Sequence, residues 1–116
     1  ASAAALVGLA NHEAIAAAKA GIIGLALSAA STYAVNNLRV NVVAPGLVET
    51  KLSHGLTESP TLRKLSESMH PLNRIGTVHD VASAICFLLD AENSWITGEV
   101  LRVDGGLSHL RSKLKA

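Results

Sequence analysis

The sequence predicts an α/β protein with a parallel sheet, in the element order long helix, strand, helices, strand. Three observations lead there: a long stretch of small and apolar helix formers, two short β-branched runs, and a helical segment between those runs. A strand, a crossover helix and a second strand form one βαβ unit. Two parallel strands do not make a stable sheet, so further strands are expected in a missing half or in another copy of the chain.

The long helix is predicted from Asn11 to about Ala34, with Asn11 as its N-cap. Its length is about 36 Å at ~1.5 Å per residue. Gly21 and Gly24 each cost about 1 kcal/mol relative to Ala in a helix interior. They make sense if another backbone packs closely against them.

The remaining elements follow from turn residues and apolar spacing. The predicted order is a strand at 38–44 stopped by Pro45 and Gly46, a loop at 47–60, a short helix at 61–69, a firmer helix at 78–89, a turn at 91–93 and a last strand at 99–103. No internal repeat or low-complexity linker divides the chain, so residues 1–116 are predicted to be a single partial domain.

The composition is that of an aliphatic globular protein. The 116 residues are 49% apolar and 3% aromatic, and ten Lys and Arg against nine Asp and Glu leave a formal charge of +1. This charge provides no electrostatic footprint for nucleic acid or an anionic membrane. No apolar run approaches the ~20 residues of a membrane span, and the start lacks the basic region of a signal peptide. A cytoplasmic protein is expected, and the absence of an initiating Met suggests residues upstream.

Several single residues have ordinary interpretations. Cys86 lies in an apolar run and is predicted to be an inert core thiol. Trp95 is predicted to anchor the turn before the last strand. The five histidines show no repeated spacing and there is no cysteine cluster, so no metal site is predicted. The basic tail of Arg111, Lys113 and Lys115 is interpreted as a solvated end.

Lys19 is the most informative residue, because it is the only charge in the small and apolar stretch 14–24. An ammonium group there is costly unless something nearby needs it. Ser2 stands thirteen residues before Ile15, and Lys19 stands four residues after it. Further along lie Asn-Val-Val-Ala-Pro-Gly-Leu-Val-Glu-Thr at 41–50, Arg-Ile-Gly-Thr-Val-His-Asp-Val-Ala at 74–82 and Ile-Thr-Gly-Glu-Val-Leu-Arg-Val-Asp-Gly-Gly at 96–106.

In this order and register, the motifs make the whole chain resemble the C-terminal half of a short-chain dehydrogenase/reductase. The resemblance implies the end of a Rossmann-like, doubly wound parallel sheet. It also implies an oxidoreductase that transfers hydride between NAD or NADP and a small carbonyl or alcohol substrate. Ser2 then orients the carbonyl and Lys19 holds the nicotinamide ribose. The turn and loop that face the nicotinamide contain Pro45, Gly46, Val48 and Thr50.

The main departure from the family is Ile15, which occupies the position of the tyrosine that exchanges a proton with the substrate. Tyr33 is fourteen residues beyond Lys19, about 21 Å along a helix at ~1.5 Å per residue, so it cannot replace that tyrosine. His12 shares a helical face with Ile15 and Lys19, and a neutral imidazole is able to act as the acid or base. The alternative is a surface histidine in the first turn, where Glu13 serves as a partner of the helix dipole.

The second departure is that no Gly-rich, phosphate-binding turn occurs in the chain. The N-terminal cofactor-binding half is therefore predicted to be absent, and the isolated chain is expected to be inactive and to bind no dinucleotide tightly. A non-catalytic relative that serves as an oligomerisation or binding module is the alternative, and a separate polypeptide that completes the sheet is a third. Similar helices pack between subunits, so the stripe of Ala16, Ala20, Gly24 and Ser28 predicts a homo-oligomer.

The segment from Thr50 to Pro71 corresponds to the part that closes over substrate in the family. Two readings are open for Thr50: a hydroxyl that meets the nicotinamide carboxamide, or a loop residue that precedes a helix. His54, Met69 and His70 lie in or beside this segment. They are either substrate contacts or loop residues without a special role.

Overall fold

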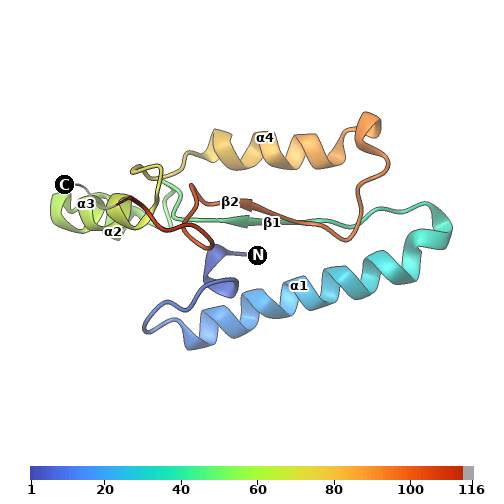
Figure 1. Cartoon of the computed structure of the whole chain (residues 1–116), viewed down its shortest axis with the longest axis horizontal. Helices are drawn as coiled ribbons and strands as arrows, with labels where there is room; N and C mark the ends of the chain where they lie inside the picture. Colours follow the sequence, from blue (N-terminus) through green and yellow to red (C-terminus); the bar gives the residue numbers. More distant parts are fainter. Residues whose placement is uncertain (114–116) are drawn as a thin grey trace.

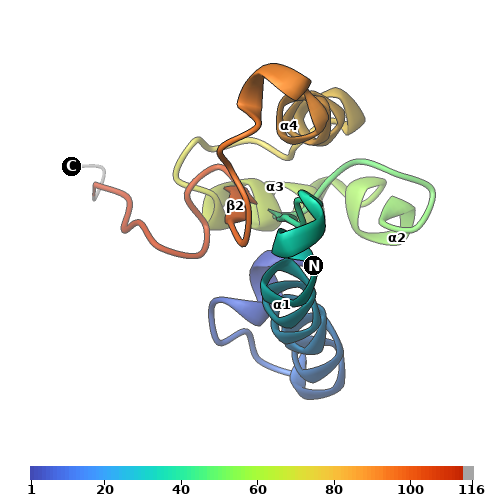
Figure 2. The same cartoon turned by 90° about the vertical axis from the view of Figure 1, so that its right-hand side faces the viewer.

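The computed structural model describes residues 1–113, so Lys115 of the predicted basic tail lies outside the described residues. Two parallel strands lie between two helical layers (Figures 1 and 2). β1 (Val42–Pro45) pairs with β2 (Val100–Val103). Helix α1 (Glu13–Tyr33) covers one face of this pair and α4 (Val78–Leu89) the other. The predicted α/β class with a parallel sheet is confirmed.

Helix α1 begins two residues after the predicted N-cap. Asn11 has a φ of 61°, in the left-handed region that Asn tolerates better than most residues, so it precedes the helix instead of capping it. His12 takes the N-cap position without a side-chain cap bond. The helix runs on into the short helix η2 (Ala34–Asn36). A Cβ added at Gly21 or Gly24 would meet nothing within 4 Å, so the described residues provide no close backbone there.

The first strand is shorter than predicted, because before Val42 side chains replace part of the backbone ladder and one backbone bond remains, from the N–H of Gly98 to the carbonyl of Val40 at 2.8 Å. The hydroxyl of Thr97 accepts from the N–H of Val40 at 3.1 Å. The side chain of Asn41 accepts from the N–H of Glu99 at 3.0 Å and donates to the carbonyl of Ile96 at 3.0 Å. The segment before β1 is thus joined to the segment before β2 without a regular strand.

Two helices lie beyond the carboxyl ends of the strands (Figure 1). The predicted loop at 47–60 is not entirely irregular, since it contains α2 (His54–Thr57), and α3 (Pro60–Met69) follows with Ser59 as its N-cap. Helix α4 has the predicted bounds, because Thr77 and Asp80 form a reciprocal capping box at its start. The remaining short helices of residues 1–113 are η1 (Ala3–Ala5) and η3 (Ala91–Asn93).

The apolar interior is small for a chain of this length. Its buried apolar residues are Ala3, Ala4, Ala26, Ala30, Val42, Ala44, Ile75 and Leu88. The radius of gyration is 15.6 Å, whereas a compact domain of this size has about 13.4 Å. The predictions for Cys86 and Trp95 are wrong: the thiol is exposed, and Trp95 is 98% exposed. In the described chain, nothing covers the outer side of α4 or the turn that follows it.

The expectation that no apolar run approaches a membrane span is also wrong by length and composition. Residues Glu13–Asn36 form 24 continuous helical residues with a mean hydropathy of 1.6 in their most apolar window. Many small residues and few charges produce this value. The same helix packs against η1 and β1, which is how a helix covers a sheet.

Asp104 holds the turn that follows β2. Its buried carboxylate accepts hydrogen bonds from the N–H of Gly106 at 2.9 Å and of Ser108 at 3.1 Å. Burial raises the pKa of Asp104, but the hydrogen bonds from Ser108 and Gly106 outweigh burial and hold the pKa below its ordinary value. The folded state therefore favours the ionised carboxylate.

This depressed pKa predicts a loss of stability in acid. The contribution of Asp104 is complete above the ordinary carboxyl pKa of about 3.9 and is lost as the pH falls through the lower pKa of the folded state. Urea unfolding followed from pH 7 to pH 3 should show the onset of this loss below about pH 4 in the parent. The Asp104→Asn variant should be less stable at pH 7 and should lose less on acidification. An unchanged pH dependence in the variant would contradict the assignment.

Candidate active site

A cavity of about 390 Å³ lies at the carboxyl end of β1, beside the start of α1. Five segments form its walls: 2–4 at the beginning of the chain, 9–15 at the start of α1, the turn at 45–47, parts of α2 and α3 up to His70, and Leu107 after β2. The walls are mostly apolar. In open α/β sheets, ligands bind beyond the carboxyl ends of the strands, which is where this cavity lies.

The cavity brings together most of the predicted site residues and leaves out three. The residues that line it are Ser2, His12, Ile15, Pro45 and Gly46. Met69 and His70 from the predicted closing segment also line it. Lys19, Val48 and Thr50 are not among the lining residues.

Ser2 stands at the N-cap of η1 with an extended backbone. Its Oγ accepts from the N–H of Ala4 at 3.1 Å, which fixes the direction of the side chain. A hydroxyl that accepts one hydrogen bond still has its own proton to donate. In residues 1–113 that proton has no acceptor, so Ser2 offers a donor at the cavity wall.

His12 is the N-cap of α1 and Ile15 lies in its first turn, and the two side chains differ in chemistry. The Nδ1 of His12 lies 2.7 Å from the carbonyl oxygen of Ala10, and because a carbonyl only accepts, Nδ1 carries the proton. The Nε2 of the neutral ring is then an acceptor without a partner in the described chain. Ile15 is 47% exposed and has no proton to exchange.

Lys19 is half-buried on helix α1. The amino group of Ala1 donates to the carbonyl of Val43, on the edge of β1 that faces away from β2, at 2.9 Å. Burial lowers the pKa of this amino group, and the positive charge of Lys19 lowers it further. The role of Lys19 toward a nicotinamide ribose stays a prediction.

The turn after β1 is packed against a buried histidine. Gly46 donates its N–H to the carbonyl of Val103 at 3.0 Å. A Cβ on Gly46 would lie 2.7 Å from Nε2 of His70 and 3.0 Å from Cα of Asp104, so only glycine fits there. The sequence placed His70 beside the closing segment, as a substrate contact or as a loop residue without a special role. Neither interpretation anticipated its burial, because the contacts that bury it come from distant segments.

Thr50 faces Ser53 and not the cavity. Its N–H donates to Oγ of Ser53 at 2.9 Å, and the two hydroxyl oxygens lie 3.3 Å apart. The hydroxyl of Ser53 in turn donates to the carbonyl of Val48. These bonds hold Thr50 within the loop before α2, and its contact with a nicotinamide stays a prediction.

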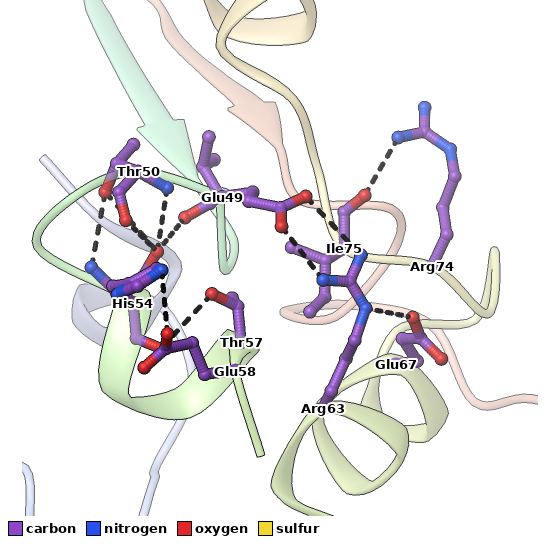
Figure 3. Close-up of polar contacts among 11 residues, drawn as sticks. Glu49, Thr50, His54, Thr57, Glu58, Arg63, Glu67, Arg74 and Ile75 are labelled. Atoms are coloured by element: carbon purple, nitrogen blue, oxygen red, sulfur yellow. Dashed lines mark hydrogen bonds and ion pairs between the residues drawn. The ribbon is translucent and has the colours of Figure 1, made fainter. Parts of the chain in front are cut away.

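Arg63 of α3 ties the loop after β1 to that helix, as Figure 3 shows. Its guanidinium donates to the carboxylate of Glu49 at 2.9 Å and to that of Glu67 at 3.1 Å. The hydrogen bond and the charge of Arg63 hold the pKa of Glu49 below its ordinary value. On α2, the exposed His54 pairs with Glu58 at 3.3 Å, and it is not among the residues that line the cavity.

Metal ligands do not gather anywhere in the described chain. Within residues 1–113, no three side chains of His, Cys, Asp or Glu come close enough to hold a metal ion. The chemistry of the cavity is thus that of a hydroxyl donor, an imidazole acceptor and an apolar wall.

Known proteins resemble this chain in both sequence and fold. Residues 1–108 match the family model described as enoyl-(acyl carrier protein) reductase. The 3-oxoacyl-(acyl-carrier-protein) reductase of Thermotoga maritima is 45% identical over 92 residues, which are 79% of this chain and 37% of the relative. The chain thus spans about two fifths of the length of this relative.

Solved structures of short-chain dehydrogenases/reductases and related dehydrogenases resemble the fold of this chain. A short-chain type dehydrogenase/reductase from Mycobacterium ulcerans superposes with a TM-score of 0.89 at 36% identity, over 97% of this chain and 41% of that one. A 4-hydroxyisoleucine dehydrogenase complexed with NADH superposes with a TM-score of 0.90 at 29% identity, over 96% and 46% of the two chains.

Proposed function

Because the chain belongs to the enoyl-(acyl carrier protein) reductase family within the short-chain dehydrogenases/reductases, we propose that it forms the C-terminal half of an NAD(P)-dependent oxidoreductase. The proposed reaction is hydride transfer between a nicotinamide and a small carbonyl or alcohol substrate. The cavity at the carboxyl end of β1 carries this proposal, since it joins the Ser2 donor to the Pro45–Gly46 turn. Relatives of this kind include a dehydrogenase complexed with NADH.

Each residue has a defined task in this proposal. Ser2 donates its hydroxyl proton to the substrate oxygen and so polarises the carbonyl. Lys19, half-buried on α1, holds the ribose of the cofactor. The apolar turn at Pro45 and Gly46 fits the flat nicotinamide ring, while Val48 and Thr50 lie farther along the same loop. When bound, the cofactor supplies or accepts the hydride.

An unfilled groove along β1 supports the proposal of a missing N-terminal half. A cavity of about 350 Å³ runs along the β1 edge that faces away from β2. Its lining includes Ala1, Val43 and the apolar Ile85, Leu88 and Leu89 of α4. An added strand would pair with this edge and cover the apolar side chains of α4. We place the phosphate-binding elements, and the choice between NAD and NADP, in that half.

The proposal has three further parts, which concern assembly, the choice of cofactor and location. The stripe along α1 leaves Ala20, Gly24 and Ser28 exposed, so a second copy of the chain has room to pack there. Neither NAD nor NADP is distinguished by the residues of this half. The complete protein is proposed to act in the cytoplasm on a small molecule.

A non-catalytic relative is the second candidate, and Ile15 favours it. The side chain that lines the cavity at this position is a hydrocarbon and carries no acid or base. His12 is the substitute that the cavity offers, with an unpartnered Nε2. Loss of turnover in His12→Ala would identify His12 as the group that exchanges the proton with substrate, whereas an inactive parent would favour the binding module.

An activity assay tests the proposed function. The 116-residue chain and the longer product read from the coding sequence upstream of Ala1 are each assayed with NADH and NADPH on carbonyl substrates, including a 3-oxoacyl thioester. Turnover is expected from the longer protein alone. Turnover by the 116-residue chain would refute the missing-half proposal.

A further inference from the structure

His70 is buried at the meeting point of three segments. It follows α3 as the C-cap residue, and only 4% of its surface is exposed. The turn after β1 contacts its ring through the N–H of Leu47, and a Cβ added at Gly105, in the turn after β2, would lie 3.8 Å from Cδ2 of the ring. His70 also lines the active-site cavity and a second cavity of about 350 Å³ beside the end of β2.

Both ring nitrogens of His70 are used, and their roles are fixed. Nδ1 lies 2.7 Å from the carbonyl oxygen of Ser66 in α3, so it carries the proton and donates. Nε2 accepts from the N–H of Leu47 at 3.2 Å. One neutral tautomer therefore connects α3 to the turn that forms a wall of the cavity.

The ring also fills the space that the missing Cβ of Gly46 leaves. Because Nε2 approaches the Gly46 position so closely, the turn cannot shift toward α3 without displacing the ring. Arg63 binds the same loop a few residues later, through Glu49. Helix α3 thus holds the loop after β1 at two points, one buried and one exposed.

We propose that His70 is a positioning residue, which transmits the position of α3 to the Pro45–Leu47 turn and so sets the surface against which the nicotinamide packs. The kinetic part of this proposal rests on the proposed oxidoreductase function. The contact between His70 and Leu47 does not, since it is a property of the fold.

Two substitutions separate the two nitrogens. In His70→Asn, the side-chain amide reaches the position of Nδ1 and retains the donor to Ser66, but the N–H of Leu47 loses its acceptor. In His70→Gln, the longer side chain places its amide oxygen near the position of Nε2 and keeps that acceptor. A lost hydrogen bond of this kind changes an equilibrium by about tenfold. The control is His54→Asn, on the exposed histidine of α2.

Amide exchange measured by NMR gives the first readout, with kinetics of the longer protein as the second. His70→Asn is expected to speed exchange at Leu47 about tenfold and to raise the KM for the nicotinamide cofactor about tenfold, with a smaller change in kcat. In His70→Gln and in the control, the exchange rate at Leu47 and the KM for the cofactor should both stay within about twofold of the parent. Equal exchange at Leu47 in the Asn and Gln variants would overturn the proposal.

The parent protein provides a test that does not depend on how the variants fold. Nitrogen-15 NMR of its ring should show His70 protonated at Nδ1 and unprotonated at Nε2. A proton on Nε2 at neutral pH would overturn the proposal. Faster exchange at Leu47 in His70→Asn, combined with no turnover by any variant, would support the contact between His70 and Leu47. It would overturn the proposed function instead.

Discussion

The Ile15→Tyr variant of the longer protein is expected to reduce carbonyl substrates about 10²–10⁴ times faster than the parent, the range that a positioned acid or base contributes. Ile15 lines the cavity with Ser2, so a phenol there meets the same substrate oxygen as the serine hydroxyl. A phenol has an ordinary pKa of about 10 and needs a nearby positive charge to act at neutral pH. Lys19, one helical turn further along α1, supplies that charge.

The matched control is Ile15→Phe, which adds the ring without the hydroxyl. Initial rates with NADH and NADPH are compared for the parent and both variants. Only the Tyr variant should gain, because only it adds a proton to exchange. An equal gain in the Phe variant would mean that ring size matters and not proton transfer. A parent that is already active, and that loses activity in His12→Ala, would assign the proton to the imidazole instead.

The Gly46→Ala variant is expected to lose about 1–3 kcal/mol of unfolding free energy, the cost of overpacking a filled site. The new methyl group would lie 2.7 Å from Nε2 of His70 and 3.0 Å from Cα of Asp104. His70 is bonded at both nitrogens and Asp104 by two backbone N–H groups, so neither gives way freely. Urea denaturation at pH 7 measures the loss.

Gly55→Ala, in helix α2, is the control for this variant. A methyl group at Gly55 meets nothing within 4 Å, and Ala is favoured over Gly in a helix by up to about 1 kcal/mol. The control should therefore be as stable as the parent or slightly more so. If Gly46→Ala were as stable as Gly55→Ala, the close packing around the turn after β1 would be disproved.

Local sequence signals predicted the elements that local interactions define. Helix α4 has its predicted bounds because Thr77 and Asp80 cap it reciprocally, and such a motif is visible in four residues of sequence. The strand before Pro45 was predicted too long, because its first half is held by the side chains of Asn41 and Thr97. Those bonds join residues more than fifty positions apart, so no local sequence pattern predicts them.

The site was predicted in the same uneven way. Spacing on one helix predicted that His12 and Ile15 share a face, and both line the cavity. His70 was not recognised as a buried contact, since the partners that bury it, Leu47 and Gly46, lie more than twenty residues earlier. Cys86 was assigned to the interior because it lies in an apolar run, and Trp95 was predicted to anchor a turn, yet the described chain has too little interior to cover either.

The most direct test of the central claim is a calorimetric titration of NADH and NADPH into two proteins, the 116-residue chain and the longer product of the upstream coding sequence. We predict saturable binding of one of the two cofactors by the longer protein, weakened about tenfold or more by Lys19→Met, and no tight binding by the 116-residue chain. Tight binding by the 116-residue chain alone, or a longer protein that binds neither cofactor, would contradict it.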